Sequence, residues 1–319
     1  MRTSIHRVTI TGACGNLGWK ILCHLVQQVE IEQVFGVDLQ RPGPEQLREL
    51  SQLPGNEKAQ FTQADLTNHA DHRWRDPVRD SHAVLHFAAQ NPFPEATWND
   101  ANHSLDMTIN IASLAAAAGV RRFVFASSNH VMGRYKDRPL SQTIGVGELA
   151  TSLEHAVGTV WKTGDTEMDS TVYAVAKSSG ERVCRALSLQ SGGSTEFVCT
   201  RIGWCQPGEN HPSTLSGAGT PTQDSSESTA EDREAAKNDR WFKSMWLSNR
   251  DFVQLHARAL FADSIPWPDP CIVVNAMSRN DGMPWSLNEA QTWLGYEPQD
   301  GIDFSAASAV NTDPEATHH

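Results

Sequence analysis

The stretch TGACGNLG, residues Thr11 to Gly18, decides the fold of this chain. It follows an apolar run that ends at Ile10 and precedes WKILCHLV, whose apolar residues recur at helical spacing. Three glycines between a strand and a helix cost conformational entropy, so we expect a ligand to approach this backbone closely. A pyrophosphate fits that expectation: Gly12 would allow a tight turn, Gly15 the approach of the ligand, and Gly18 the packing of the helix on the sheet.

Strand-like and helix-like segments alternate along the sequence. Short runs rich in apolar, β-branched or aromatic residues begin at Arg7, Gln33, Ala59, Ala83, Arg122, Glu196 and Cys271. Longer segments rich in alanine and leucine, such as 111–119, lie between them. Because the strands are almost continuously apolar, we expect both faces of the sheet to be covered. The pattern predicts an α/β protein of the Rossmann type with a doubly wound parallel sheet.

The length and composition of the chain bear on its domain organisation. With 319 residues, the chain suits one large α/β unit and a smaller lobe. We expect residues 1–203 to form a dinucleotide-binding domain that carries the catalytic residues, and residues 204–319 to form a small C-terminal substrate lobe. Residues 217–239 hold almost no apolar side chains, which predicts a mobile polar insertion or, as the alternative, a lid over the active site.

The charge and the cysteine pattern argue against several classes of partner. A net charge of −12 argues against binding to nucleic acid, and no apolar run approaches the ~20 residues needed to span a membrane. The six cysteines are scattered, which indicates reduced thiols and a cytoplasmic location. His69 and His72 stand one short turn apart without a third ligand, so we predict no metal site.

Asp38 bears on the choice of cofactor. It ends the second predicted strand, 20 residues after Gly18, where a carboxylate accepts hydrogen bonds from the ribose hydroxyls of a dinucleotide. The same charge would repel the extra phosphate of NADP, so the sequence favours NAD. Arg41 is close enough to accept that phosphate, which keeps NADP as the alternative. Asp65 follows the third strand, where it could bond the adenine, cap a helix, or do both.

Four motifs occur together in the chain. They are T-G-x-x-G-x-x-G at Thr11–Gly18, HFAA at His86–Ala89, SSNHVMG at Ser127–Gly133 and Y-x-x-x-K at Tyr173–Lys177. In the types and order of these motifs, the chain resembles the extended short-chain dehydrogenase/reductases, which form the NAD-dependent epimerase/dehydratase family. The resemblance covers most of the chain. The resemblance implies that the cofactor is bound by Gly12, Gly15, Asn16, Leu17, Gly18, Asp38, Asp65, Leu66, Ala88, Tyr173 and Lys177. It also allows a homo-oligomer, because a dimer through two helices is common in this family.

The resemblance gives Tyr173, Lys177 and Ser128 the roles of catalytic residues. Oxidation of a carbinol needs a base that takes the hydroxyl proton as the hydride leaves. A free tyrosine has a pKa of ~10 and is a poor base at neutral pH. Lys177 follows one helical turn later, and its charge, together with that of the oxidised nicotinamide, favours the phenolate. Ser128 would orient the substrate oxygen, and the alternative for Tyr173 is an aromatic residue on a helix surface.

A narrower resemblance is to the uronate dehydrogenases. It rests on ASSNHV at Ala126–Val131, RIG at Arg201–Gly203, WLS at Trp246–Ser248 and LGYEPQD at Leu294–Asp300. Those enzymes use NAD to oxidise the anomeric hydroxyl of galacturonate or glucuronate, which gives the lactone. The resemblance implies that the substrate is bound by Asn91, Ser128, Asn129, His130 and Tyr173.

This chain departs from the uronate dehydrogenases at two positions of the sugar pocket. Trp204 stands where they carry a small polar residue, so we expect it to narrow or reshape the pocket. Uronate dehydrogenases carry an arginine that binds the substrate carboxylate, and Arg240 stands nearest to that position in this sequence. The alternative for Arg240 is a solvated loop arginine. The leading hypothesis is therefore an NAD-dependent sugar dehydrogenase acting on a uronate-like, sulfonated or phosphorylated monosaccharide in carbohydrate catabolism, with a neutral aldose as a further option. The alternatives are a nucleotide-sugar epimerase or dehydratase with tightly bound NAD, and a non-catalytic NAD-sensing regulator.

Overall fold

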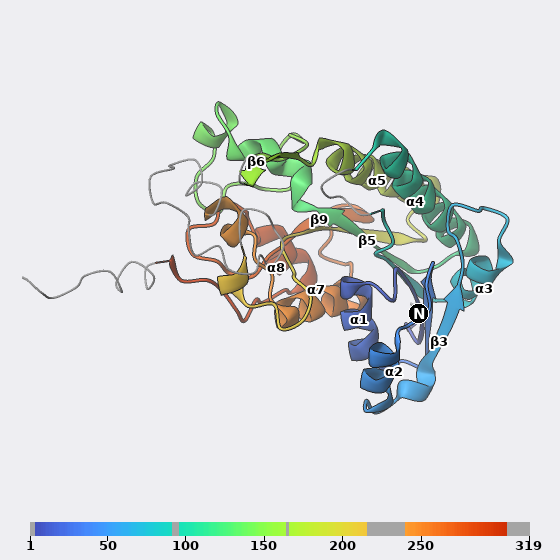
Figure 1. The fold of residues 1–319 in the computed structure, drawn as a ribbon. Helices are drawn as coiled ribbons and strands as arrows, with labels where there is room; N and C mark the ends of the chain where they lie inside the picture. The colour runs from blue at the N-terminus through green and yellow to red at the C-terminus, as the bar shows by residue number, and fades with distance from the viewer. Residues whose placement is uncertain (1–3, 91–95, 164–165, 216–239, 305–319) are drawn as a thin grey trace, which may run out of the picture.

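The centre of the molecule is a seven-stranded sheet. The computed structural model describes residues 4–90, 96–163, 166–215 and 240–304 (Figure 1). The strand order is β3-β2-β1-β4-β5-β8-β9, and every neighbouring pair is parallel. These strands are β1 (Arg7–Thr11), β2 (Gln33–Asp38), β3 (Ala59–Gln63), β4 (Ala83–His86), β5 (Arg122–Ser128), β8 (Glu196–Ile202) and β9 (Cys271–Ala276). All seven begin at the predicted residues, and the predicted doubly wound parallel sheet is confirmed.

Helices cover both faces of this sheet (Figure 1). One face carries α3 (His72–Asp80), α4 (Trp98–Ala118) and α5 (Thr171–Gln190). The other carries α1 (Asn16–Val26), α7 (Asn249–Phe261) and α8 (Asn288–Leu294), and α2 (Pro44–Ser51) follows β2. The strand order reverses between β1 and β4, so a crevice for a ligand is expected at the carboxyl ends of these strands.

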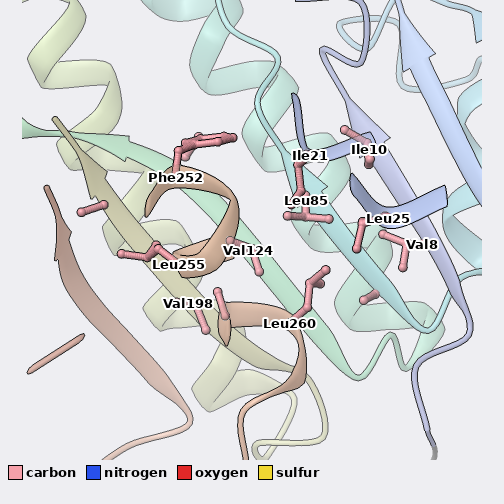
Figure 2. Close-up of a cluster of buried hydrophobic side chains, with 14 of the residues drawn as sticks. Val8, Ile10, Ile21, Leu25, Leu85, Val124, Val198, Phe252, Leu255 and Leu260 are labelled. Atoms are coloured by element: carbon pink, nitrogen blue, oxygen red, sulfur yellow. The ribbon is translucent and has the colours of Figure 1, made fainter. Parts of the chain in front are cut away.

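Each face of the sheet buries its own core. Figure 2 shows the core under α1 and α7, where strand residues such as Val8 and Val124 pack against Ile21 and Leu255. On β5, Val124 belongs to this core, whereas its neighbours on either side, Phe123 and Phe125, belong to the core under α3, α4 and α5. This alternation is the two-residue period of a strand, so the sheet is buried on both sides.

A third apolar cluster lies beyond the carboxyl end of β5. It joins apolar residues from 131–161 and Met168 with Trp204 and apolar residues from 241–287, and it includes Trp161, Phe242 and Trp285. Its first part contains the 3-10 helix η2 (Asn129–Lys136) and the antiparallel hairpin of β6 (Val160–Thr163) and β7 (Thr166–Asp169), which the sequence analysis did not predict. Three further short 3-10 helices are η1 (Asn56–Lys58), η3 (Leu140–Gln142) and η4 (Pro212–Thr214).

The predicted C-terminal lobe contributes to two of these layers. From the expected lobe 204–319, β9 joins the main sheet and α7 packs on it, whereas Trp204 and Phe242 belong to or pack on the third cluster. The boundary at residue 203 stays a prediction. The predicted insertion at 217–239 lies outside the described residues. None of the helices in the described part of the chain is long and apolar enough to cross a membrane.

Candidate active site

The three glycines of the first loop meet different surroundings. Gly12 has a φ of +68°, and a Cβ placed there would lie 2.7 Å from the backbone nitrogen of Ala88. A Cβ on Gly18 would overlap the carbonyl oxygen of Gly12. At Gly15 the same oxygen would be 3.3 Å away, and no other described heavy atom comes within 4 Å. Gly12 and Gly18 are therefore required by the packing of the chain on itself, and Gly15 leaves its backbone open to a ligand.

The amino end of α1 suits a phosphate group. Among the described residues, no side chain caps this end, so the first-turn N–H groups remain available for a ligand. The Asn16 side chain is turned elsewhere, because its Nδ2 donates to the carbonyl oxygen of Cys205 at 2.9 Å. Leu17 packs against the core under α1. Of the predicted cofactor residues in this turn, Asn16 and Leu17 therefore offer their backbone amides.

Asp38 lies beside this loop. Its Oδ2 accepts a hydrogen bond from the Cys14 backbone nitrogen at 2.9 Å, and its Oδ1 accepts one from the Gln40 nitrogen at 3.1 Å. A carboxylate has about four lone-pair sites, so acceptor capacity remains for ribose hydroxyls. Arg41 is exposed next to it. The residues present fit the dinucleotide predicted from the sequence.

Asp65, Leu66 and Ala88 lie after the third and fourth strands. Asp65 is exposed and accepts from the nitrogen and hydroxyl of Thr67 at 2.9 and 2.7 Å, which closes a local turn. The next helix, α3, is capped by Asp71, so the interpretation of Asp65 as a helix N-cap is wrong. Leu66 is buried. The Ala88 nitrogen donates to the Thr11 hydroxyl at 3.4 Å, next to Gly12.

The three predicted catalytic residues come together at the carboxyl end of β5. Tyr173 and Lys177 lie one turn apart on α5, and the Ser128 side chain lies at the Tyr173 hydroxyl, where it acts to lower the pKa of the phenol. The Lys177 ammonium donates to the carbonyl oxygen of Ala126 at 2.7 Å and lies 5.6 Å from the centre of the Tyr173 ring. Ser128 is buried and also accepts from the His130 backbone nitrogen at 3.2 Å. The three residues therefore lie together, as their predicted roles of base, charged neighbour and orienting hydroxyl require.

Burial dominates the electrostatics of this group. It raises the pKa of Tyr173 to about 12, and the hydrogen bond from Ser128 acts in the opposite direction. It also lowers the pKa of Lys177 to about 8. The phenol therefore keeps its proton at neutral pH in the chain without cofactor. The predicted phenolate requires more positive charge than Lys177 alone supplies.

Asn129 and His130 are fixed by hydrogen bonds to other segments of the chain, which would orient them for a ligand. His130 Nδ1 lies 2.8 Å from the hydroxyls of both Thr159 and Ser170, and burial lowers the pKa of the imidazole to about 4, so the ring is neutral. Asn129 Nδ2 donates to the carbonyl oxygen of Ile202 at 2.9 Å. Its Oδ1 is buried without a hydrogen-bond partner among the described residues. That oxygen is a ready acceptor for a sugar hydroxyl.

An aromatic layer stands next to the catalytic tyrosine. The ring centre of His130 is 6.0 Å from those of both Tyr173 and Trp204. The Trp204 ring in turn packs edge-on against Phe242, 5.0 Å away, and Phe242 lies 5.1 Å from Trp161. His130 therefore contacts both Tyr173 and Trp204, and the narrowing of a sugar pocket by Trp204 stays a prediction.

Arg240 lies at a cavity that Ser128, Tyr173 and Lys177 do not line. It is exposed and lines this cavity of about 660 Å³ together with Lys136 and Trp241. Lys136 makes an ion pair with Asp137 at 2.8 Å. Asn91, the remaining predicted substrate residue, lies outside the described residues.

Three residues of this region escaped the sequence analysis. Thr159 and Ser170 fix His130, and they come from the unpredicted hairpin region 159–170. Lys136 reaches the cavity because η2 continues for eight residues after Ser128. No short motif marks these positions. The length of the segment 135–171 is the one signal in the sequence, because it indicates additional structure between β5 and α5.

Comparison with known proteins places the chain in a family. Residues 8–205 match the model of the NAD dependent epimerase/dehydratase family. The L-arabinose 1-dehydrogenase (NAD(P)(+)) of Haloferax volcanii is 32% identical over 68% of this chain and 74% of the relative. The NAD-dependent glucose-6-phosphate dehydrogenase of the same organism is 26% identical over 92% of this chain and 93% of the relative.

Solved structures agree with this placement at the level of the fold. The crystal structure of a glucuronic acid dehydrogenase from Chromohalobacter salexigens superposes with a TM-score of 0.65 and 22% identity, covering 98% of this chain and 92% of that chain. The predicted resemblance to this family and to uronate dehydrogenase-like proteins is confirmed, and so is NAD as the predicted cofactor. This chain belongs to the NAD dependent epimerase/dehydratase family.

Proposed function

We propose that the protein is an NAD-dependent sugar dehydrogenase, which oxidises the anomeric hydroxyl of a monosaccharide to the lactone in carbohydrate catabolism. The observation that carries this proposal is the group of Ser128, Tyr173 and Lys177 at the carboxyl end of β5. The relatives support it, because two of them are named as dehydrogenases of arabinose and glucose 6-phosphate. The wider prediction, an oxidoreductase acting on CH–OH groups, is confirmed by the same kinship.

The residues divide the work of the reaction between them. Gly15 and the first turn of α1 would hold the pyrophosphate, and Asp38 the ribose hydroxyls. Bound NAD supplies a hydride acceptor and a positive charge. Ser128 would hold the anomeric oxygen, and Tyr173 Oη would take its proton as the C1 hydrogen leaves as hydride, so that the C1–O bond becomes a carbonyl. Lys177 would stabilise the phenolate by its charge.

We further propose a substrate with an anionic group. Arg240 and Lys136 line the same cavity, and a guanidinium binds a carboxylate, sulfonate or phosphate through paired hydrogen bonds. Because Lys136 is already paired with Asp137, Arg240 would carry most of the recognition. The half-buried ring of Trp204, which packs on His130 and on the buried Phe242, would offer apolar surface for a sugar ring.

The test is turnover with purified protein and NAD. Hexuronates, sugar phosphates, sulfosugars, neutral aldoses and nucleotide sugars are supplied in turn, the absorbance of reduced cofactor is followed, and the sugar product is identified. We expect net cofactor reduction. The kcat should rise with pH, because burial raises the pKa of the Tyr173 phenol, which must lose its proton to act as the base. Conversion of a nucleotide sugar without net reduction would indicate an epimerase, and NAD binding without any turnover would indicate a regulator.

A further inference from the structure

One face of α5 is tied to three consecutive residues of β5. Tyr173, Lys177 and Glu181 follow at four-residue spacing, so they share this face. The Ser128 side chain lies at the Tyr173 hydroxyl, where it acts to lower the pKa of the phenol, and the Ala126 carbonyl accepts a hydrogen bond from Lys177. Between these two, the Ser127 hydroxyl donates to Glu181 Oε1 at 2.5 Å. Only the first two of these three links involve predicted catalytic residues on α5, and the third has no role so far.

The neighbouring strand completes the third link. Arg201 of β8 is the register partner of Ser127. Its Nε donates to Glu181 Oε1 at 3.0 Å, and its Nη2 donates to Glu181 Oε2 at 2.9 Å. Arg201 is 1% exposed and Glu181 is 4% exposed. Burial acts to raise the pKa of Glu181, but the hydrogen bonds from His155, Arg201 and Ser127 and the charge of Arg201 outweigh it and hold the pKa at about 2. The pair is therefore charged at neutral pH.

A loop covers this ion pair and shares in it. His155 Nε2 lies 2.8 Å from Arg201 Nη2, and its Nδ1 lies 2.8 Å from the hydroxyl of Ser178, the residue after Lys177. The ion pair thus joins four segments: the active-site ends of β5 and β8, the middle of α5, and the loop before β6. Two residues after Arg201 the chain reaches Gly203, and then Trp204 of the aromatic layer.

We propose that Glu181 and Arg201 are positioning residues, which fix the axial position of α5 and thereby place Tyr173 against Ser128 and Lys177 against Ala126. They act through Ser127 and the helix, without touching substrate or cofactor. The role as stated rests on the proposed function, because its consequence is a productive geometry for proton transfer. A displacement of about 1 Å at reacting groups can lower a rate by about 100-fold.

The chain contains a matched control for this ion pair. Arg122 and Glu196 are register partners at the opposite ends of the same two strands, and their Nη2–Oε2 distance is 2.8 Å. Both are buried. Both are buried pairs of an arginine and a glutamate with one member on β8, but only the pair of Glu181 and Arg201 includes a residue of the helix that carries Tyr173. Removal of one charge alone would leave the other buried and unpaired, whereas removal of both is far better tolerated.

The experiment compares two double variants, Glu181→Gln/Arg201→Met and Arg122→Met/Glu196→Gln. We expect similar falls in Tm. We expect only the first to lower kcat, by about 100-fold, while the KM for the sugar and the Kd for NAD stay within about threefold. Wild-type kcat in the first variant, or an equal fall of kcat in both, would overturn the proposal. Ser127→Ala removes the hydrogen bond between β5 and Glu181 and leaves the ion pair of Glu181 and Arg201 in place. If the first double variant does not fold, an unchanged kcat in Ser127→Ala refutes the positioning role.

A second readout separates this proposal from the proposed function. Amide hydrogen exchange in residues 171–181 should be faster in Glu181→Gln/Arg201→Met than in Arg122→Met/Glu196→Gln, with or without a known substrate. If the wild-type protein turns over no sugar but this difference appears, the proposed reaction is wrong and the positioning of α5 stands. If wild-type protein is active and the exchange of the two variants is the same, the positioning role is wrong.

Discussion

The cofactor side and the sugar side of the candidate site are built in different ways. The cofactor side is mostly backbone: the loop from Gly12 to Gly18 and the first amides of α1 come from one short stretch of chain. The sugar side is made of side chains from remote segments, in which His130 meets Trp161 and Trp204, and both of these rings pack against Phe242. A backbone site depends little on side-chain identity, so it can stay constant while the sugar side changes. Substitutions on the two sides should therefore separate cofactor affinity from turnover and substrate choice.

Tyr173→Phe should give the largest effect and the sharpest separation. It removes the proton acceptor and leaves the backbone loop unchanged, so we expect kcat to fall by about 1,000-fold or more, with the Kd for NAD within about threefold of wild type. Steady-state kinetics and NAD titration measure the two quantities. The control is Tyr296→Phe, which removes a buried hydroxyl bonded to the Met277 carbonyl, far along the chain from the catalytic group. Substantial activity in Tyr173→Phe would remove Tyr173 from the mechanism.

The same contrast explains what could be predicted from the sequence. All seven strands of the sheet and the roles of Gly12 and Gly18 follow from local patterns, because periodicity and loop chemistry act over short spans. The His130 hydroxyl partners Thr159 and Ser170 could not be predicted, since they are brought in by a hairpin without a motif. Glu181 stands four residues after Lys177, but only the fold shows that Arg201 reaches it.

Gly12→Ala should break the cofactor side. The left-handed φ of +68° costs an alanine about 1–2 kcal/mol, and its Cβ would press on the backbone of Ala88, which cannot yield without moving the β4 loop. If the strain and the displacement of the Ala88 backbone together cost NAD binding about 2.8 kcal/mol, the Kd for NAD rises about 100-fold, since each 1.4 kcal/mol is tenfold. Gly119→Ala is the control, because φ there is +73° but nothing lies within 4 Å of the new Cβ. Both variants should lose stability, and equal NAD affinities would mean that the loop does not hold the cofactor.

Arg240→Met tests the sugar side at its outer edge, and here the expected effect is the smallest. A hydrogen bond to a charged group contributes about 1.5–3 kcal/mol. Because Arg240 is exposed, solvent weakens this contribution, and we expect KM for an anionic sugar to rise about tenfold. The KM for a neutral aldose and the Kd for NAD should not change, and Arg48→Met, at an exposed arginine on α2, should alter none of the three. Equal KM changes for neutral and anionic sugars would mean that Arg240 shapes the cavity without recognising charge. In that case the choice of substrate would rest on Trp204 and the aromatic layer alone.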